Sequence, residues 1–341
     1  MQIRIDKIEK FILLGGGLLV VELARWCKCE GEQVFIVTSP RQASEIVESG
    51  KSFAEILSIE KISYKIIEDI SSNEVKSYLG NLTNAFCLSS GAAWIYKKET
   101  IKTLFNGKLF NLHGTKLPQN RGGGGFSWHI LMGIRFGFCQ LHLVDSGVDS
   151  GEIVKTEEFL YPPSCRIPKE YQSVSYEKNL NFVINFFREI RQFGLDKKTF
   201  KQTEYFSSYF PRLNTLENGW INWDDNILDL EKFICAFDEP YTGAKCLWKG
   251  KNVSIKKVCI DFSDQNFHPY QIGIVYRINK NWLCVCAKGG SLIIEKVNDE
   301  KGLSIMKDIK EGDRFITNSN AIQNRFNRVS YTPMGMRNNI N

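Results

Sequence analysis

Hydrophobic residues in the N-terminal half of the chain come in short runs that alternate with segments of helical spacing. The run FILLGGG at 11–17 is apolar and ends in glycines, and the segment 18–31 has apolar residues at helical spacing before Gly31. The next run, QVFIVTS at 33–39, has the continuous apolar character of a strand buried on both faces. The order of strand, helix and strand predicts a βαβ unit and therefore a parallel sheet.

This alternation continues to about residue 195. Further strands are expected at 59–67, 84–90, 108–114 and 138–145, and helices at 97–105, 128–137 and 170–193. We therefore expect an α/β fold, with a Rossmann-like, open, mostly parallel sheet that is flanked by helices. In such folds ligands bind in the crevice at the carboxyl ends of the strands.

The pattern changes beyond residue 205. A helix is expected at 227–238, and from Gly243 onward short strands follow one another with turn residues between them. This pattern is typical of a small antiparallel sheet or barrel. We predict an N-terminal domain at 1–205, a linker with a smaller, strand-rich, barrel-like domain at 206–317, and a loose tail at 318–341 that is rich in Asn and Arg.

Composition and charge mainly exclude classes of protein. A net charge of +6 over 341 residues permits an anionic ligand such as a nucleotide, but it falls short of the clustered basic face of a nucleic-acid-binding protein. The ten cysteines include no C-x-x-C, and with four histidines they indicate buried small residues in a reducing compartment rather than a zinc site. The apolar run at 11–24 is too short to span a bilayer, so we expect a cytoplasmic protein with no membrane partner.

Three glycines at 15–17 suggest a dinucleotide-binding turn at first sight. They lack the G-x-G-x-x-G spacing, because Leu18, Leu19 and Val20 follow them, and no acidic residue ends the second strand near Val37. We interpret these glycines as a tight turn from strand to helix.

The clearest candidate chemistry lies at the end of the strand at 108–114. Asn111 and His113 are two residues apart, so their side chains point to the same face of the strand. An amide donor beside an imidazole can hold an oxyanion and transfer a proton, although each residue alone is as easily structural. His142 faces one side of the following strand, as a site residue or a half-buried one. Asp149 lies in an Asp-Ser-Gly turn and could orient an imidazole.

Two segments around these residues resemble folate-dependent formyltransferases. NLHGTKLPQNRG at 111–122 resembles that family's N-x-H-x-S-L-L-P-x-x-R-G signature, and VDSGVDSGEI at 144–153 looks like its D-x-G-x-D-T-G segment. Asn111, His113 and Asp149 match the family's catalytic triad in identity, order and approximate spacing. Segments after residue 211 are similar to the linker and the C-terminal domain shared by methionyl-tRNA and several sugar-nucleotide formyltransferases.

The resemblance implies transfer of a formyl group from N10-formyltetrahydrofolate, the co-substrate, to a primary amine, with no metal. In that reaction Asn111 would donate to the formyl oxygen, and Asp149 would hold His113. His113 would either take the proton of the amine or stabilise the oxyanion. The resemblance places a folate site at Trp94, Ile95, Tyr96, Asp145 and Gly147. It places the acceptor along the following loop, at Thr115, Arg121, Gly122, Phe126 and Trp128.

The sequence indicates the formyl donor more clearly than the molecule that accepts the formyl group. We favour the amino sugar of a nucleotide-linked sugar, such as a dTDP-amino sugar used for polysaccharide synthesis, because the segment QNRGGGGFSWH at 119–129 carries one Arg and no basic insertion. Methionyl-tRNA is the alternative acceptor. A tRNA enzyme would need basic residues in this loop for phosphate contacts, which is why we favour the sugar. A non-catalytic nucleotide- or RNA-binding protein of the same fold is a third hypothesis. A nucleic-acid partner is expected only with the tRNA alternative, and a homodimer is possible.

Overall fold

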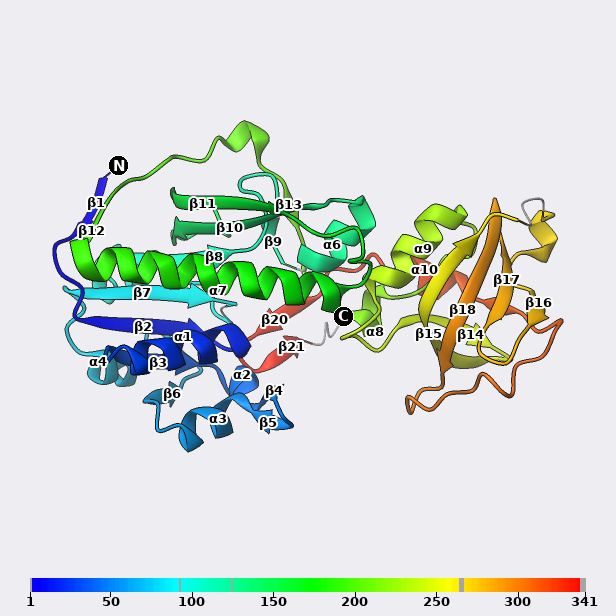
Figure 1. Ribbon diagram of the computed structural model, residues 1–341, viewed down its shortest axis with the longest axis horizontal. Coiled ribbons are helices and arrows are strands. Elements are labelled where there is room, and N and C mark those ends of the chain that lie inside the picture. The colour runs from blue at the N-terminus through cyan, green and yellow to red at the C-terminus, as the bar shows by residue number, and fades with distance from the viewer. Residues whose placement is uncertain (1, 92, 124, 264–266, 338–341) are drawn as a thin grey trace.

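A seven-stranded, mostly parallel sheet forms the centre of the N-terminal half. The computed structural model describes residues 2–91, 93–123, 125–263 and 267–337 (Figure 1). In spatial order the strands are β11 (Ile153–Leu160), β10 (Phe136–Leu143), β8 (Leu109–His113), β7 (Ala85–Ser90), β2 (Lys10–Gly15), β3 (Gln33–Thr38) and β6 (Tyr64–Ile66). The strands from β8 to β6 are parallel to one another. At one edge of the sheet β10 is antiparallel to β8, and β11 is antiparallel to β10. The predicted α/β fold class is confirmed.

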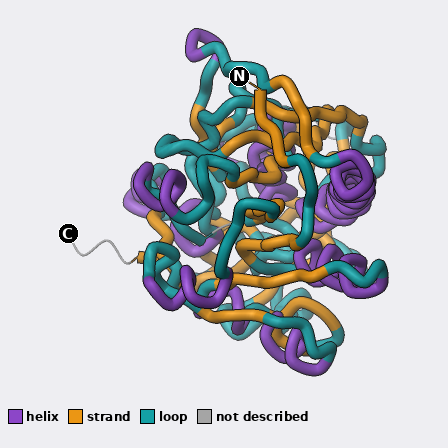
Figure 2. The backbone as a smooth tube through the Cα atoms, turned by 90° about the vertical axis from the view of Figure 1, so that its left-hand side faces the viewer, coloured by secondary structure: helices purple, strands orange, loops and turns teal. Residues whose placement is uncertain are grey.

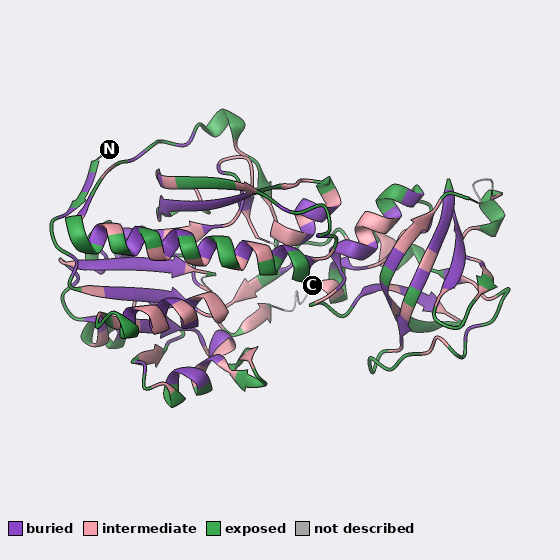
Figure 3. Cartoon of the chain, viewed as in Figure 1, coloured by how far each residue is buried: buried purple, intermediate pink, exposed green. Residues whose placement is uncertain are grey.

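Helices cover both faces of this sheet because its strands alternate their buried side chains between two cores. In β2, Phe11 and Leu13 join the core beneath α1 (Leu18–Cys29), α3 (Phe53–Ile59) and α7 (Pro168–Phe193). Their neighbours Ile12 and Leu14 join a second core beneath α4 (Asn73–Leu79) and α5 (Lys98–Thr103). The strands are correspondingly buried along most of their length (Figure 3), and Figure 2, viewed along the long axis, shows helices on both sides of the strands.

A second, antiparallel sheet curls into a half-barrel in the C-terminal half (Figure 1). Its strands in spatial order are β16 (Val275–Ile278), β17 (Leu283–Ala287), β18 (Gly290–Asn298), β15 (Lys251–Asp261), β14 (Ala244–Trp248) and β19 (Phe315–Ile316). The helix α9 (Ile227–Ala236) packs on this sheet and also contacts α6 (Gly125–Met132) of the N-terminal half. Ile130 of α6 shares a core with residues of the half-barrel, so the two halves are packed together.

Several short elements connect these layers. They are β1 (Gln2–Ile5) paired with β12 (Leu195–Lys198), β4 (Ile46–Glu48) paired with β5 (Lys51–Ser52), β9 (Arg121–Gly122) paired with β13 (Tyr209–Phe210), α2 (Pro40–Ser44), α8 (Thr215–Asn218), η1 (Glu204–Phe206) and η2 (Pro269–Gln271). The β9–β13 pair matters most for the site. It joins the glycine-rich loop to the segment that leads into the C-terminal half.

The C-terminal segment differs from the loose tail that its composition suggested. Residues 318–337 form α10 (Ser319–Asn324) and the hairpin of β20 (Ser330–Thr332) and β21 (Gly335–Arg337), which returns to the N-terminal sheet (Figure 1). Asn218 donates its amide hydrogens to the carbonyls of Arg325 at 2.8 Å and Asn327 at 3.0 Å. At the far end the N–H of Arg41 donates to the Pro333 carbonyl at 3.3 Å. These are contacts between distant segments, which local composition does not reveal; residues 338–341 lie outside the described chain.

Candidate active site

The ends of β8 and β10 bring three polar side chains together. The two strands are antiparallel neighbours, and their register sets Asn111 directly opposite His142. His113 lies two residues beyond Asn111 on β8 and therefore on the same face of the sheet. The imidazole rings of His113 and His142 are 6.2 Å apart between centroids.

Asp149 reaches this group from the loop that follows β10. Its Oδ1 lies 3.4 Å from Asn111 Nδ2, and its Oδ2 lies 3.7 Å from His113 Nδ1. The backbone N–H of Gly122 donates to Oδ2 at 2.9 Å, and the amide of Gln202 donates to the Asp149 carbonyl at 2.8 Å. The structure thus places Asn111, His113 and Asp149 in one cluster, although they are 38 residues apart at the widest.

Hydrogen bonds to a carbonyl define where the proton of His113 lies. The Nε2 atom is 2.7 Å from the Asn120 carbonyl and 2.6 Å from the hydroxyl of Thr115, which itself donates to that carbonyl at 2.8 Å. A carbonyl can only accept, so Nε2 carries the hydrogen and Nδ1 of the neutral ring carries the lone pair. The atom facing Asp149 is therefore the basic nitrogen of the ring.

The same argument gives the protonated nitrogen of His142 and shows how the two amide hydrogens of Asn111 are bonded. His142 Nδ1 lies 2.7 Å from the Leu143 carbonyl, so Nδ1 carries the proton and Nε2 accepts from Asn111 Nδ2 at 3.1 Å. The second N–H of Asn111 has only the 3.4 Å contact with Asp149, a weak hydrogen bond at that length. One amide hydrogen of Asn111 is thus anchored and the other is loosely held.

Burial and the neighbouring groups together lower the pKa of both His113 and Asp149. Burial lowers the pKa of His113 below its ordinary value, and the charge of Asp149 only partly offsets this effect. Burial would raise the pKa of Asp149, but the His142 and His113 rings and the Gly122 N–H outweigh it and lower that pKa to about 2. At neutral pH the cluster therefore holds a neutral base beside an ionised carboxylate.

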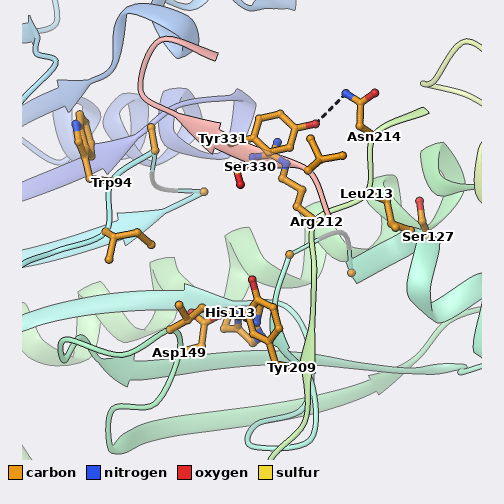
Figure 4. A pocket seen from close by; sticks show the side chains of 18 of the residues that line it. Trp94, His113, Ser127, Asp149, Tyr209, Arg212, Leu213, Asn214, Ser330 and Tyr331 are labelled. Atoms are coloured by element: carbon orange, nitrogen blue, oxygen red, sulfur yellow. Dashed lines mark hydrogen bonds and ion pairs between the residues drawn. The ribbon is translucent and has the colours of Figure 1, made fainter. Parts of the chain in front are cut away.

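A cleft of about 980 Å³ opens over this cluster. We call Asn111, His113, His142 and Asp149 the floor of the cleft. The roof consists of Arg212 and residues 328–332, which also line the cleft. In Figure 4 His113 and Asp149 lie below, and Ser330 and Tyr331 of the hairpin lie above them with Arg212 between. The cleft is large enough for two small-molecule substrates that meet at the floor.

All five predicted folate contacts line this cleft: Trp94, Ile95, Tyr96, Asp145 and Gly147. Trp94 is held by its indole N–H, which donates to the Glu68 carbonyl at 2.9 Å. Ile95 is 73 % exposed, which gives the cleft an apolar surface for a flat ring system. Asp145 accepts from the Gly147 N–H at 3.0 Å and the Ser150 hydroxyl at 2.6 Å, which shapes the loop along that wall.

The predicted acceptor contacts divide into two groups. Gly122 and Phe126 line the cleft, whereas Thr115, Arg121 and Trp128 do not. Thr115 is hydrogen-bonded to His113, as described above, and so fixes the orientation of that ring. The buried guanidinium of Arg121 donates to Gln202 and Glu204, and the Trp128 indole donates to the Pro211 carbonyl at 2.9 Å.

The chain itself approaches the glycine-rich loop at two positions. Gly122 has φ +100°, and a Cβ at this position would lie 2.1 Å from the Phe210 carbonyl oxygen of the paired strand. A Cβ at Gly123 would lie 2.9 Å from Cβ of Arg212. Glycine is therefore needed for close packing of the 209–212 segment, which also leaves the Gly122 N–H free to reach Asp149. Gly124 lies outside the described residues.

The roof was not identified from the sequence. Its residues come from the linker and from the segment expected to be a loose tail, and no local motif links these two regions. The signal available was compositional: aromatic and arginine residues recur at 209–212 and at 325–331. Such residues are ordinary on a surface, so their spacing does not predict a binding site.

The described residues contain neither a metal-binding cluster nor a membrane-spanning helix. No group of three or more His, Cys, Asp or Glu side chains is arranged to hold a metal ion among them. Within the same part of the chain, no helix combines the length and apolar character that a membrane span requires.

Comparisons with known proteins agree with the fold. Residues 214–312 match the family model described as "Formyl transferase, C-terminal domain". The methionyl-tRNA formyltransferase of Mycoplasma genitalium is 26% identical over 224 residues, which cover 62% of this chain and 65% of that protein, just under two thirds of its length.

Solved structures of formyltransferases share the fold of this chain at lower sequence identity. The N-formyltransferase of Helicobacter canadensis, solved with folinic acid and dTDP-3-aminofucose, superposes with a TM-score of 0.63 at 19% identity and covers 84% of this chain and 99% of its own. The methionyl-tRNA formyltransferase of Clostridium thermocellum superposes with a TM-score of 0.51 at 18% identity and covers 75% and 96%. The chain is therefore similar to formyl transferases: residues 214–312 match their C-terminal domain, and the fold is that of solved formyltransferases.

Proposed function

We propose that the protein transfers the formyl group of N10-formyltetrahydrofolate to the primary amine of an amino sugar on a nucleotide carrier. The observation that carries this proposal is the cluster of Asn111, His113 and Asp149 on the floor of a cleft with an apolar wall at 94–96. The match of residues 214–312 to a formyl transferase C-terminal domain and the folate and sugar ligands of the Helicobacter canadensis protein support the choice of substrates.

The wall at 94–96 fits the flat, polar-edged pterin of the folate. Ile95 and Trp94 supply apolar surface, and the loop at 145–147 supplies backbone groups for the ring edges. The amine nitrogen adds to the formyl carbon of the folate and gives up a proton to His113. The bond between that carbon and N10 then breaks as N10 takes the proton from His113, which releases tetrahydrofolate. The protein contributes positioning, hydrogen-bond donors and a base.

The proton of the attacking amine passes to His113 in this proposal. An amine must be neutral to attack, and it loses a proton as the new bond forms. His113 is neutral near pH 7, lines the cleft and keeps its lone pair on Nδ1, so we assign it the role of base in preference to that of oxyanion stabiliser. Asp149 stabilises the protonated ring that results, because its carboxylate is 3.7 Å from Nδ1.

Asn111 stabilises the formyl oxygen as that oxygen gains negative charge. Its anchored N–H to His142 fixes the direction of the amide, and the N–H that is weakly bonded to Asp149 is the one that turns to the oxygen. A donor aimed at developing charge is worth about 10²–10³ in rate.

Methionyl-tRNA remains the second candidate acceptor, because several curated relatives are methionyl-tRNA formyltransferases. A direct test gives the purified protein N10-formyltetrahydrofolate with either dTDP-amino sugars or charged initiator tRNA, and follows the mass of each acceptor. We expect the amino sugar to gain one formyl group and the tRNA to remain unmodified. Formylation of the tRNA alone would reverse the choice of acceptor, and formylation of neither would refute the proposal.

A further inference from the structure

The hairpin at 330–337 is fixed above the floor by contacts of its first strand and of its turn. The Tyr331 hydroxyl accepts from the Asn214 amide at 3.0 Å (Figure 4). In the turn, the Pro333 carbonyl accepts from the Arg41 N–H. Val329, just before the hairpin, is buried. Because residues 328–332 line the cleft, they form a roof that a ligand above the floor can contact.

Arg212 is presented to the cleft by an aromatic platform. Its guanidinium carbon is 4.4 Å from the centre of the Tyr331 ring, a cation–π distance. Stacking of this kind fixes the plane of the guanidinium and leaves its N–H edges available for oxygen ligands. Among the residues that the structure describes, no carboxylate forms a salt bridge with Arg212. Arg328 is held similarly, 5.3 Å from the Tyr209 ring and donating to its hydroxyl at 3.1 Å.

Charges of opposite sign line the two sides of the cleft. The carboxylates in its described lining are Asp145 and Asp149, which belong to the loop below, whereas the guanidinium groups of Arg212 and Arg328 belong to the roof. A third cleft arginine, Arg41, is paired with Glu45. This separation orients a ligand that carries an amine at one end and an anion at the other, with the amine at the floor and the anion at the roof.

The position of the two arginines favours the acceptor over the folate. Arg212 packs against Gly123, and the Tyr209 ring that holds Arg328 packs against Gly122, so both groups stand beside the glycine-rich loop. The apolar wall proposed for the pterin is formed by other loops, at 94–96 and 144–147.

We infer that Arg212, stacked on Tyr331 of the C-terminal hairpin, binds the diphosphate of the nucleotide-linked acceptor, with Arg328 as its partner. This inference rests on the proposed function for the identity of the acceptor. It assigns the segment at 328–332 a direct part in substrate selection. Planar guanidinium groups bind phosphate oxygens in pairs, which suits a diphosphate better than a single charge.

Direct binding tests the inference without any catalytic step. Calorimetry would measure the affinity of the full-length protein for dTDP and, separately, for 5-formyltetrahydrofolate. We expect Arg212→Gln and Arg328→Gln each to weaken dTDP binding by about tenfold or more, since a hydrogen bond to a charged group contributes that much. Folate affinity should be unchanged. Arg337→Gln is the matched control, because Arg337 belongs to the same hairpin but does not line the cleft.

A second variant distinguishes an effect of the Tyr331 ring on ligand binding from an effect on folding. Tyr331→Leu removes the ring beneath Arg212 and should weaken dTDP binding by a few fold, with a melting temperature close to that of Arg337→Gln. Unchanged dTDP affinity in Arg212→Gln would overturn the inference, and so would a loss of folate affinity in its place, because the arginines would then hold the carboxylates of the folate. Failure of the wild-type protein to bind dTDP would also overturn it. Failure of formyl transfer with dTDP binding intact would refute the proposed function alone.

Discussion

The floor and the roof of the cleft are built in opposite ways. The floor comes from the ends of two paired strands and one loop within residues 111–149, and its polar groups are buried or half-buried and hydrogen-bonded to one another. The roof combines residue 212 with residues 328–332, and its arginines are exposed and held on aromatic rings. In our proposals the sheet positions the reacting groups, whereas segments from distant parts of the chain recognise the acceptor.

The largest expected effect comes from the base of the floor. Replacing His113 by Ala removes the only proposed proton acceptor and should lower kcat by about 10²–10⁴-fold. Steady-state turnover measures this loss, with circular dichroism to verify folding. His268→Ala in the C-terminal half is the control and should keep normal turnover. Near-normal turnover without His113 would disprove its role.

Asn111→Ala should lower kcat by about 10²–10³-fold, because one donor to the formyl oxygen is lost. Calorimetry with 5-formyltetrahydrofolate should show little change in affinity, since this donor acts mainly on the developing charge. If the variant instead loses folate affinity and keeps kcat, Asn111 binds substrate and does not act in the reaction. The floor would then bind ligand as the roof is proposed to do.

Asp149→Asn should change the pH dependence as well as the rate. In the wild-type protein kcat rises with pH as His113 loses its proton, with a midpoint below the ordinary histidine value because burial lowers the pKa of His113. The Asp149 charge raises that pKa, so removing the charge lowers it and moves the midpoint to more acidic pH, while the plateau falls. A midpoint that stays in place would show that Asp149 does not act on His113.

Packing between floor and roof can be probed through Gly122. In Gly122→Ala the new Cβ would collide with the Phe210 carbonyl and occupy a strained φ, at a cost of about 1–3 kcal/mol. Gly133→Ala is the matched control, because Gly133 also has positive φ (+68°) but no atom within 4 Å of the new Cβ. Thermal unfolding should show a larger loss of stability for Gly122→Ala than for Gly133→Ala. Equal losses would mean that the segment at 209–212 shifts to make room for the new methyl group at little cost.

The smallest expected effect is at the roof. Tyr331→Phe keeps the ring beneath Arg212 and removes only the hydrogen bond from Asn214. We expect KM for the acceptor to rise by no more than a few fold, with kcat and KM for the folate unchanged. A fall in kcat comparable to that of Asn111→Ala would contradict the division of the cleft into floor and roof.

Much of the sheet and of the floor followed from the sequence. Buried strands such as β2 and β7 carry continuous apolar runs, and the spacing of Asn111 and His113 places both side chains on one face of β8. The long motif around them made Asp149 a candidate as well. The strands and the meeting of these three side chains could be predicted because each depends on residues that are close in the chain or on one recurring motif.

The remaining features depend on pairing between distant segments. His142 joins the floor through the register of β8 with β10, which periodicity alone does not define. Arg121 resembled an acceptor contact, but its guanidinium is bonded to Gln202 and Glu204, more than 80 residues away. The roof likewise forms only because the C-terminal segment folds back over the cleft, so its composition alone indicated a loose tail.

In the proposed function, formyl transfer takes place at the floor with His113 as the base. The mass of a dTDP-amino sugar tests this step directly, after incubation with N10-formyltetrahydrofolate and either the wild-type protein or His113→Ala. We expect one added formyl group with the wild-type protein and almost none with the variant. No transfer by the wild-type protein, or equal transfer by the two proteins, would contradict it.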